Sequence, residues 1–211
     1  MSDASSIPDG AHAFRSRKAW LWFLGTIAIS FAIDIATKYI AFHRIAGTPV
    51  TVHREEVVAA TPRLWTLIPQ HEPVTIIPKV LDFTLVLNPG AVFGIGAGKR
   101  WFFIVFTALA VAIGSYIFAK HTRAQDRLMH IALGLVLGGG LGNLYDRLIY
   151  ACVRDFIHPL PGVLYPFSTP ASWAGKEVWP YVSNVADAFL IVGVVFLAWR
   201  AIRTPAPASR R

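Results

Sequence analysis

Residues Ser183–Arg200 read SNVADAFLIVGVVFLAWR. Apart from its first turn the stretch is apolar, and with its neighbours it reaches the length of about 20 residues that a helix needs to cross the hydrocarbon core of a bilayer. It nevertheless begins with Asn184 and Asp187, although a charged side chain costs about 2.5–3.5 kcal/mol at the centre of a bilayer and less near an interface. The stretch therefore predicts a membrane helix and raises the question of what Asp187 does there.

The composition of the whole chain is that of a membrane protein. It has 211 residues, of which 55% are hydrophobic and 15% charged, and its mean hydropathy is +0.50. In a soluble domain about a quarter of the residues are charged. We therefore expect an all-α membrane fold, a four-transmembrane-helix bundle that forms one domain over residues 1–211, with disordered tails at about 1–14 and 204–211. The expected helices lie at about residues 20–40, 101–119, 129–150 and 181–199.

Basic residues cluster before the first apolar stretch, between the second and the third, and after the fourth. The net charge of +8 therefore indicates an orientation in the membrane rather than binding to nucleic acid. By the positive-inside rule both termini are cytoplasmic, and the segments 43–100 and 151–180 are external. Within the first of these segments, the alternation in Val50–Val52 and Asp82–Leu87 predicts short strands, so we expect a small external β-structure.

In this orientation the polar residues of the apolar stretches all lie near the external interface. They are Asp34, Lys38, Asn143, Asp146, Arg147, Asn184 and Asp187. Asp155 follows the third stretch, and Asn88 and Gly90 lie in the external segment before the second. Ionisable residues within membrane helices are rare and mark functional sites by default. Their common depth predicts a single polar site.

Three pairs of these residues are spaced so that both members share a helical face. The pairs are Asp34 with Lys38 and Asn143 with Arg147, both at i,i+4, and Asn184 with Asp187 at i,i+3. Glycines at positions 138–140 and 142 remove side chains from the third stretch. A neighbouring helix or a ligand can therefore approach its backbone closely.

Asp155 and Asp187, if they lie together, predict the acid–base chemistry of a carboxylate pair. Two carboxylates a few ångströms apart share one proton, because both cannot ionise at low cost. The ionised partner can take a proton from water while the protonated one hydrogen-bonds a scissile carbonyl. This predicts peptide hydrolysis without a covalent intermediate or a metal. The pair titrates as a unit, so neither residue is assigned its own pKa, and which of them holds the proton stays open.

Five blocks of the sequence resemble lipoprotein signal peptidase (signal peptidase II), a family of bacterial aspartyl endopeptidases classed as peptidase family A8. The blocks are DIATK (Asp34–Lys38), NPGAVFG (Asn88–Gly94), GGGLGNLYDR (Gly138–Arg147), VRDFI (Val153–Ile157) and NVADA (Asn184–Ala188). Each block alone is weak. Together they follow the family's order and its places relative to four helices, over most of the chain, which makes the resemblance specific.

The resemblance implies cleavage of prolipoproteins just before a diacylglyceryl-modified cysteine, at the external face of the bacterial plasma (inner) membrane, by an enzyme that globomycin-type inhibitors target. It implies that Asp155 and Asp187 are the catalytic pair. The other site residues divide into those that contact substrate or shape the pocket, which are Asn88, Gly90, Asn143 and Arg147, and those that support it, which are Asp34, Lys38, Asp146 and Asn184. It also implies that the external segment forms a small β-cradle on the membrane surface.

The chain departs from the family's pattern in three places. Ser183 stands where the family usually has Phe, so packing beside the aspartates differs. The stretches 43–79 and 158–180 are longer than usual. The second of them lies between Asp155 and Asp187 and is either a lid or an insertion without a catalytic role.

Structural alternatives remain open for several of these residues. Asp155 could end a helix at a surface turn, and Asp187 could cap a helix at the interface. Asp34 and Lys38 could form an ion pair that holds helix packing instead of touching the substrate. Arg147 could extend to the interface instead of lining a pocket.

Other motifs are rejected. GIGAGKR (94–100) lacks the spacing and the hydroxyl of a phosphate loop, and the seven histidines show no ligand spacing, so neither a metal nor another cofactor is expected. Cys152 is expected to be a small buried residue rather than a nucleophile paired with His158. The competing function is a non-enzymatic membrane protein that binds lipid or lipoprotein, whose carboxylates hold a head group or relay protons. For the peptidase, membrane lipids and prolipoproteins are the expected partners, and a monomer suffices.

Overall fold

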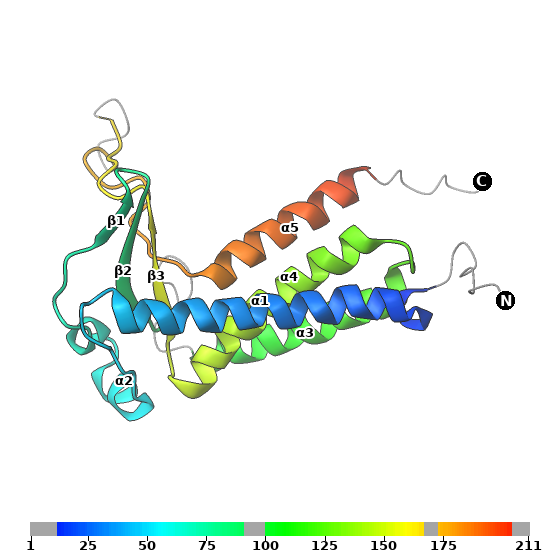
Figure 1. Cartoon of the computed structure of the whole chain (residues 1–211), viewed down its shortest axis with the longest axis horizontal. Coiled ribbons are helices and arrows are strands. Elements are labelled where there is room, and N and C mark those ends of the chain that lie inside the picture. Colours follow the sequence, from blue (N-terminus) through cyan, green and yellow to red (C-terminus); the bar gives the residue numbers. More distant parts are fainter. Residues whose placement is uncertain (1–11, 91–99, 167–172, 204–211) are drawn as a thin grey trace. The chain divides into compact units, whose positions relative to one another are not determined.

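The computed structural model describes residues 12–90, 100–166 and 173–203 (Figure 1). Its contacts group into two units. The first comprises Met1–Ala32, Thr107–Leu141 and Ala186–Arg211, and the second comprises Ile33–Phe106 and Gly142–Val185. The single domain expected over residues 1–211 stays a prediction. The expected disordered tails lie outside the described residues, except for 12–14, of which 13 and 14 belong to a short 3₁₀ turn.

The elements follow one another in a simple order. They are η1 (Ala13–Arg15), α1 (Arg17–Arg44), α2 (Arg54–Ala60), η2 (Leu64–Leu67), β1 (Val74–Ile77), β2 (Leu81–Asn88), α3 (Arg100–His121), α4 (Arg127–Ile149), β3 (Val153–Pro159) and α5 (Val185–Arg203). Helices α1, α3 and α4 each contribute residues to both units.

Four helices of the described chain, α1, α3, α4 and α5, are long and apolar enough to cross a membrane, which confirms the prediction. The start of α5 differs from the expected position near 181. The backbone of Ser183 donates to the carbonyl of Ile157 and accepts from its N–H, both at 2.8 Å, so the chain is extended there and α5 begins only at Val185. Asn184 therefore precedes the helix, and the prediction that it shares a helical face with Asp187 is wrong.

The surfaces of α3 and α5 suit a lipid environment. In the most apolar window of each helix, only 11% of the residues are buried by the described chain. Exposed side chains such as Leu109 and Ile113 of α3 and Val195 of α5 are apolar. Lipid tails are as apolar as these side chains, so leaving them uncovered by protein carries no penalty in a bilayer.

Close packing holds the helices of the first unit. Gly139 of α4 lies so near α5 that an added Cβ would stand 2.6 Å from the carbonyl oxygen of Ala186. The rings of Phe23 in α1 and Phe118 in α3 stack with their centroids 4.0 Å apart. Such van der Waals contacts at small residues are what drives helix association in membranes. The glycine run thus allows the close approach that the sequence predicted.

The second unit contains a three-stranded antiparallel sheet in the order β1-β2-β3 (Figure 1). The strand predicted at Asp82–Leu87 is confirmed within β2. The strand predicted at Val50–Val52 is wrong: the backbone N–H of Val50 bonds the carbonyl of Phe42 instead, and its side chain is buried in the core. Strand β3 escaped prediction because its first four residues are all buried, which leaves no alternation to recognise.

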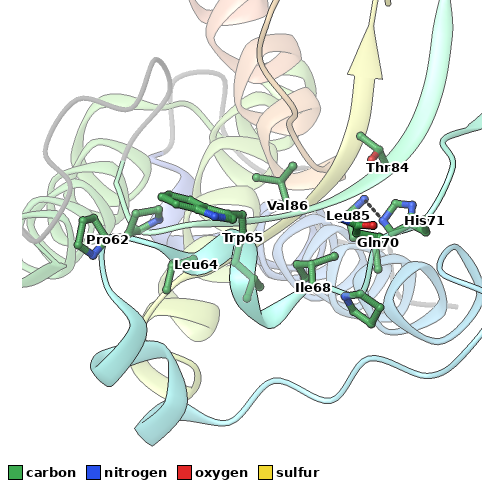
Figure 2. A pocket seen from close by; sticks show the side chains of 12 residues that line it. Pro62, Leu64, Trp65, Ile68, Gln70, His71, Thr84, Leu85 and Val86 are labelled. Atoms are coloured by element: carbon green, nitrogen blue, oxygen red, sulfur yellow. Dashed lines mark hydrogen bonds between the residues drawn. The ribbon is translucent and has the colours of Figure 1, made fainter.

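A groove lies beside β2 in the second unit (Figure 2). Its volume is about 540 Å³, and its lining includes Trp65 of η2, His71 and the β2 residues Thr84–Leu87. The ring of His71 accepts the backbone N–H of Leu85 at 3.3 Å. The groove extends to Pro89, which directly follows β2, so the strand that forms its wall also carries Asn88 of the candidate site.

Candidate active site

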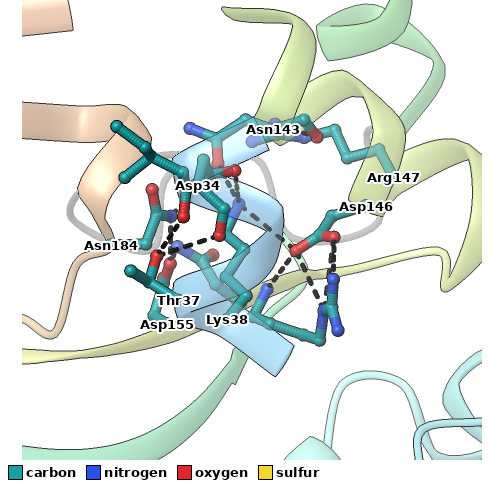
Figure 3. Close-up of polar contacts among 11 residues, drawn as sticks. Asp34, Thr37, Lys38, Asn143, Asp146, Arg147, Asp155 and Asn184 are labelled. Carbon is teal, nitrogen blue, oxygen red and sulfur yellow. Dashed lines mark hydrogen bonds and ion pairs between the residues drawn. The ribbon is translucent and has the colours of Figure 1, made fainter. Parts of the chain in front are cut away.

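Lys38 lies at the centre of a buried charge cluster in the second unit (Figure 3). Its ammonium stands 2.8 Å from Oδ2 of Asp34, one turn earlier in α1, and 3.3 Å from Oδ2 of Asp146 in α4. It also donates to Oδ1 of Asn143 at 3.0 Å. These ion-pair partners have fully buried side chains. Burying charges at this depth is affordable only because they are paired and hydrogen-bonded.

Gly142 makes room for this cluster. A Cβ at this position of α4 would collide with the carboxylate of Asp34. The absence of a side chain lets α1 and α4 come close enough for Lys38 to reach Asn143 and Asp146. The glycine run therefore serves the polar site as well as helix packing.

Arg154 of β3 is the residue of this cluster that sequence reasoning missed. Its guanidinium donates to the carboxylate of Asp146 through Nη2 at 2.8 Å and Nε at 3.3 Å, and its backbone N–H donates to the same carboxylate at 3.0 Å. The guanidinium carbon of Arg154 also lies 4.3 Å from the ring centroid of Tyr150. Two carboxylates thus face two cations. A signal was present in the basic residue of the VRDFI block, but the pairing joins a helix to a strand and has no sequence spacing.

Asp155, the next residue of β3, is buried and faces two amide side chains. Asn184 donates to its Oδ1 at 2.6 Å, and Asn88 donates to its Oδ2 at 3.0 Å. The same Nδ2 of Asn184 donates to Oδ1 of Asn143 at 3.1 Å. A chain of hydrogen bonds therefore runs from Lys38 through two asparagines to Asp155 (Figure 3).

Arg147 contacts the turn that follows Asn88. Its Nη2 donates to the carbonyl of Gly90 at 2.9 Å, and its Nη1 donates to the carbonyl of Asn143 at 3.2 Å. Its guanidinium also lies 5.1 Å from the ring centroid of Phe103. The backbone N–H of Gly90 donates in turn to Oδ1 of Asn88 at 2.9 Å. Arg147 therefore holds the turn that aims Asn88 at Asp155.

Asp187 belongs to the first unit. It lies in the first turn of α5, three residues after Asn184, and is half-buried. A carboxylate in the first turn is favoured by the positive end of the helix dipole, which also fits the capping alternative. The structure thus brings the other predicted residues together within the second unit, while the pairing of Asp155 with Asp187 stays a prediction.

The geometry bears on the structural alternatives left open by the sequence. Asp155 lies in a strand and is 1% exposed, so it does not end a helix at a surface turn. Asp34 and Lys38 have no exposed surface, which favours the ion pair over direct contact with a substrate. Arg147 is buried and bonded to backbone carbonyls, so it does not extend to the membrane interface.

The electrostatics of β3 follow from its burial and its carboxylate neighbours. Burial alone would lower the pKa of Arg154, but the hydrogen bonds and charge of Asp146, with smaller effects of Tyr150 and Asp34, outweigh it and raise that pKa. Burial, helped by the charge of Asp146, raises the pKa of the Cys152 thiol to about 12. His158 is engaged elsewhere, with its Nε2 at 3.2 Å from the carbonyl of Trp179. Cys152 is thus the buried neutral residue that the sequence predicted.

Some predicted features lie outside the described residues. These are Ala91–Gly94 of the second block, most of the rejected phosphate-loop motif, and 167–172 of the longer external stretch. Within 12–90, 100–166 and 173–203, no group of three or more His, Cys, Asp or Glu side chains is placed to hold a metal ion.

The sequence matches one family model and several proteins of that same family. The sequence profile of the family "Signal peptidase (SPase) II" matches residues 26–203. The lipoprotein signal peptidase of Desulfitobacterium hafniense (strain DSM 10664 / DCB-2) is 39% identical over 126 residues, which cover 60% of this chain and 72% of that protein. That of Bacillus subtilis (strain 168) is 38% identical over 127 residues, with the same coverage of 60% and 72%.

Solved structures support the fold. One bacterial membrane enzyme determined by the in meso method superposes with a TM-score of 0.61 at 23% identity, covering 89% of this chain and 92% of that one. A second gives a TM-score of 0.58 at 24% identity, covering 86% and 93%. The four membrane helices and the small sheet are therefore a fold known among bacterial membrane enzymes. The chain belongs to the signal peptidase II family, the A8 family of aspartyl peptidases.

Proposed function

We propose that this protein removes the signal peptides of diacylglyceryl-modified prolipoproteins by cutting the peptide bond before the lipidated cysteine. The observation that carries this proposal is the setting of Asp155. It is a buried carboxylate in the family's VRDFI block, with an amide donor on each oxygen. One of these donors, Asn184, opens the block that contains Asp187. Membership of the signal peptidase II family supplies the substrate class.

The proposed chemistry uses Asp155 and Asp187 as a pair that shares one proton. The ionised aspartate takes a proton from water, whose oxygen attacks the scissile carbonyl carbon, while the protonated aspartate gives its proton to the carbonyl oxygen. The tetrahedral intermediate then collapses: the C–N bond breaks, one proton passes to the leaving amine, and the pair is left with one proton again. No covalent intermediate forms.

The neighbouring polar residues would orient this pair and the substrate. Asn88 and Asn143 lie on the two sides of Asp155 along the hydrogen-bond chain, and Arg147 holds Gly90 in place. The buried ions Asp34, Lys38 and Asp146 would support the site from beneath without touching the substrate. We propose that a monomer in the bacterial inner membrane performs the reaction, with the site near the external face and both termini in the cytoplasm.

The test uses purified full-length protein and a synthetic precursor peptide that carries the diacylglyceryl cysteine. Wild-type protein should cut before the lipidated residue, as mass spectrometry of the products would show, and a globomycin-type inhibitor should block the reaction. Asp155→Asn and Asp187→Asn should each reduce the rate by at least about 10⁴-fold, as loss of a residue from a catalytic unit does.

Asp126→Asn is the matched control. Asp126 makes an ion pair with Arg200 at 3.3 Å, and neither residue is among the predicted site residues. It should cut the peptide at the wild-type rate. Full cleavage by either purified active-site variant would overturn the proposed pair, and an intact precursor with wild-type protein would overturn the proposed reaction.

A further inference from the structure

Lys38 fixes the orientation of the amide next to it. An ammonium group has three donors and no acceptor, so the atom of Asn143 that faces it at 3.0 Å must be the carbonyl oxygen. That same Oδ1 lies 3.1 Å from the amide of Asn184, which must therefore present its nitrogen. The direction of every donor in this part of the chain of hydrogen bonds is thus set by one buried cation.

The consequence reaches Asp155. The amide nitrogen of Asn184 carries two hydrogens, and the second one points to Oδ1 of Asp155 at 2.6 Å. This bond is the shortest of the three hydrogen bonds that link Lys38 to Asp155. Reversal of the Asn184 amide would turn its oxygen to both acceptors. Lys38 thereby makes reversal of the Asn184 amide costly, although it lies two hydrogen bonds away from that amide and three from Asp155.

The other oxygen of Asp155, Oδ2, also faces an amide donor whose orientation is fixed, in this case by a backbone N–H instead of Lys38. The backbone N–H of Gly90 donates to Oδ1 of Asn88, and a backbone N–H is always a donor. Asn88 must therefore present its nitrogen to Oδ2 of Asp155, at 3.0 Å. Both oxygens of one carboxylate thus face donors whose direction is imposed from outside. Hydrogen bonds to a carboxylate favour its charged form.

We propose that Lys38 is a positioning residue that directs this amide relay and so holds Asp155 as the ionised member of the catalytic pair, which makes Asp155 the general base and leaves the shared proton to Asp187. The inference rests on the proposed function. It divides the roles within the pair, which neither the sequence spacing nor family membership does.

Other charged groups of the second unit do not weaken the assignment. From α1 and α4, Asp34 and Asp146 are paired with Lys38, and Arg147 adds a further cation beside Asn143. From β3 itself, Arg154 lies next to Asp155 in sequence and is paired with Asp146. Lys38 and Arg154 are thus paired with carboxylates of this cluster, while the amides of Asn88 and Asn184 are directed at the two oxygens of Asp155.

The pH dependence of kcat/KM for the lipidated precursor peptide tests the assignment. The acid limb reports protonation of the ionised member, and the alkaline limb reports loss of the shared proton. Asn88→Ala and Asn184→Ala each remove one donor from the charged form of Asp155. Each should therefore move the midpoint of the acid limb up by about one pH unit and leave the alkaline limb in place.

The role of Lys38 is tested by the double variant Asp34→Asn/Lys38→Met, which removes one positive and one negative charge together and so keeps the cluster balanced. It should move the acid limb in the same direction, by about one pH unit. Thr37→Val is the matched control, because within the described part of the chain the Thr37 hydroxyl donates only to carbonyls of its own helix, those of Ile33 and Asp34. Its profile should match that of the wild type.

Each outcome decides the proposal. If the alkaline limb moves in Asn88→Ala and Asn184→Ala while the acid limb stays, Asp155 carries the proton and the assignment is overturned. If both asparagine variants behave as expected but the Asp34→Asn/Lys38→Met profile is unchanged, Lys38 does not direct the relay. Failure of wild-type protein to cut the peptide would instead overturn the proposed function itself.

Discussion

Asp146 is the residue on which the buried charges of the site converge. Its carboxylate forms an ion pair with Lys38 and accepts hydrogen bonds from both the guanidinium and the backbone N–H of Arg154. A carboxylate in this position ties α1, α4 and β3 together through charge-assisted hydrogen bonds, which are about twice as strong as neutral ones. The paired charges of Asp34, Lys38, Asp146 and Arg154 are linked through the two asparagines to Asp155.

Gly142 gives a prediction at the scale of one residue. Gly142→Ala places a methyl group against the carboxylate of Asp34, and overpacking of this kind costs about 1–3 kcal/mol. The thermal midpoint of the purified protein in detergent should fall. Gly140→Ala, two residues earlier in α4, adds a Cβ at an ordinary 3.5 Å from Thr107 and should leave the midpoint unchanged. Equal midpoints for the two variants would contradict the close approach of Asp34 to α4.

Cys152 gives a second prediction for a single residue. Its pKa is raised to about 12, so the thiol stays protonated throughout the physiological range and becomes reactive only as the pH approaches that value. A maleimide reagent at pH 7 should leave the folded protein unlabelled and label it after denaturation. Cys152→Ala should retain precursor cleavage. Loss of cleavage in a folded Cys152→Ala protein would restore the thiol as a candidate nucleophile.

What the sequence could predict at this scale depended on spacing. The i,i+4 spacing predicted that Lys38 shares a helical face with Asp34 and Arg147 with Asn143, and the structure shows an ion pair in the first case and a bond to the backbone carbonyl of Asn143 in the second. The contact of Arg154 with Asp146 joins the end of a helix to a strand, and no periodicity announces it. The direction of the asparagine amides was also out of reach, because it depends on which donor each amide meets in three dimensions.

At the scale of elements, β3 is the part of the fold that positions the site. It pairs with β2 so that Val86 stands opposite Asp155 and Asn88 opposite Val153. Its other neighbour is the extended backbone at Ser183, which accepts from Phe156 and Ile157. Asp155 is therefore held between β2 and the segment that leads into α5. Prediction of the four long helices succeeded because their apolar length is a signal by itself, whereas β3 is short and its first four residues are all buried.

Arg154 provides the prediction for this element. Arg154→Met leaves Asp146 with less compensation, and removing one partner of a buried ion pair costs about 3–5 kcal/mol. Because the pKa of Arg154 is raised in the folded protein, its contribution to stability is complete below its usual pKa and is lost only at pH above it. Chemical unfolding at pH 6 and pH 9 should therefore show the same loss relative to wild type.

Arg154→Lys is the comparison for this variant. Lysine keeps the charge but not the two-point geometry of the guanidinium, so an intermediate loss of stability is expected. Wild-type stability for Arg154→Met would show that the ion pair with Asp146 does not hold β3.

At the scale of the whole molecule, the charge distribution predicts the orientation in the membrane. Single cysteines introduced into a Cys152→Ala background test it. Gln125, in the turn between α3 and α4, and Glu72, before β1, are both exposed. Cysteine at position 72 should react with a membrane-impermeant maleimide in intact spheroplasts, and cysteine at position 125 only after permeabilisation. The reverse pattern would invert the proposed topology and put the site on the cytoplasmic face.

The fold as a whole was largely predictable because lipid imposes a simple rule. A membrane-spanning helix must be apolar over about 20 residues, so each polar residue within it stands out and calls for an explanation. The residues Asp34, Lys38, Asn143 and Arg147 were found in this way. The loop that carries Val50 misled the same reasoning, since alternation in an external segment can reflect burial in a small core as well as a strand.

The central claim is that Asp155 and Asp187 act as one catalytic unit, and a double-mutant cycle on precursor cleavage tests it most directly. The rates to compare are those of wild type, Asp155→Asn, Asp187→Asn and the double variant, under single-turnover conditions. Residues that act as a unit are strongly non-additive, so the double variant should be no slower than the slower single variant. A rate loss in the double variant equal to the product of the two single losses would contradict the claim.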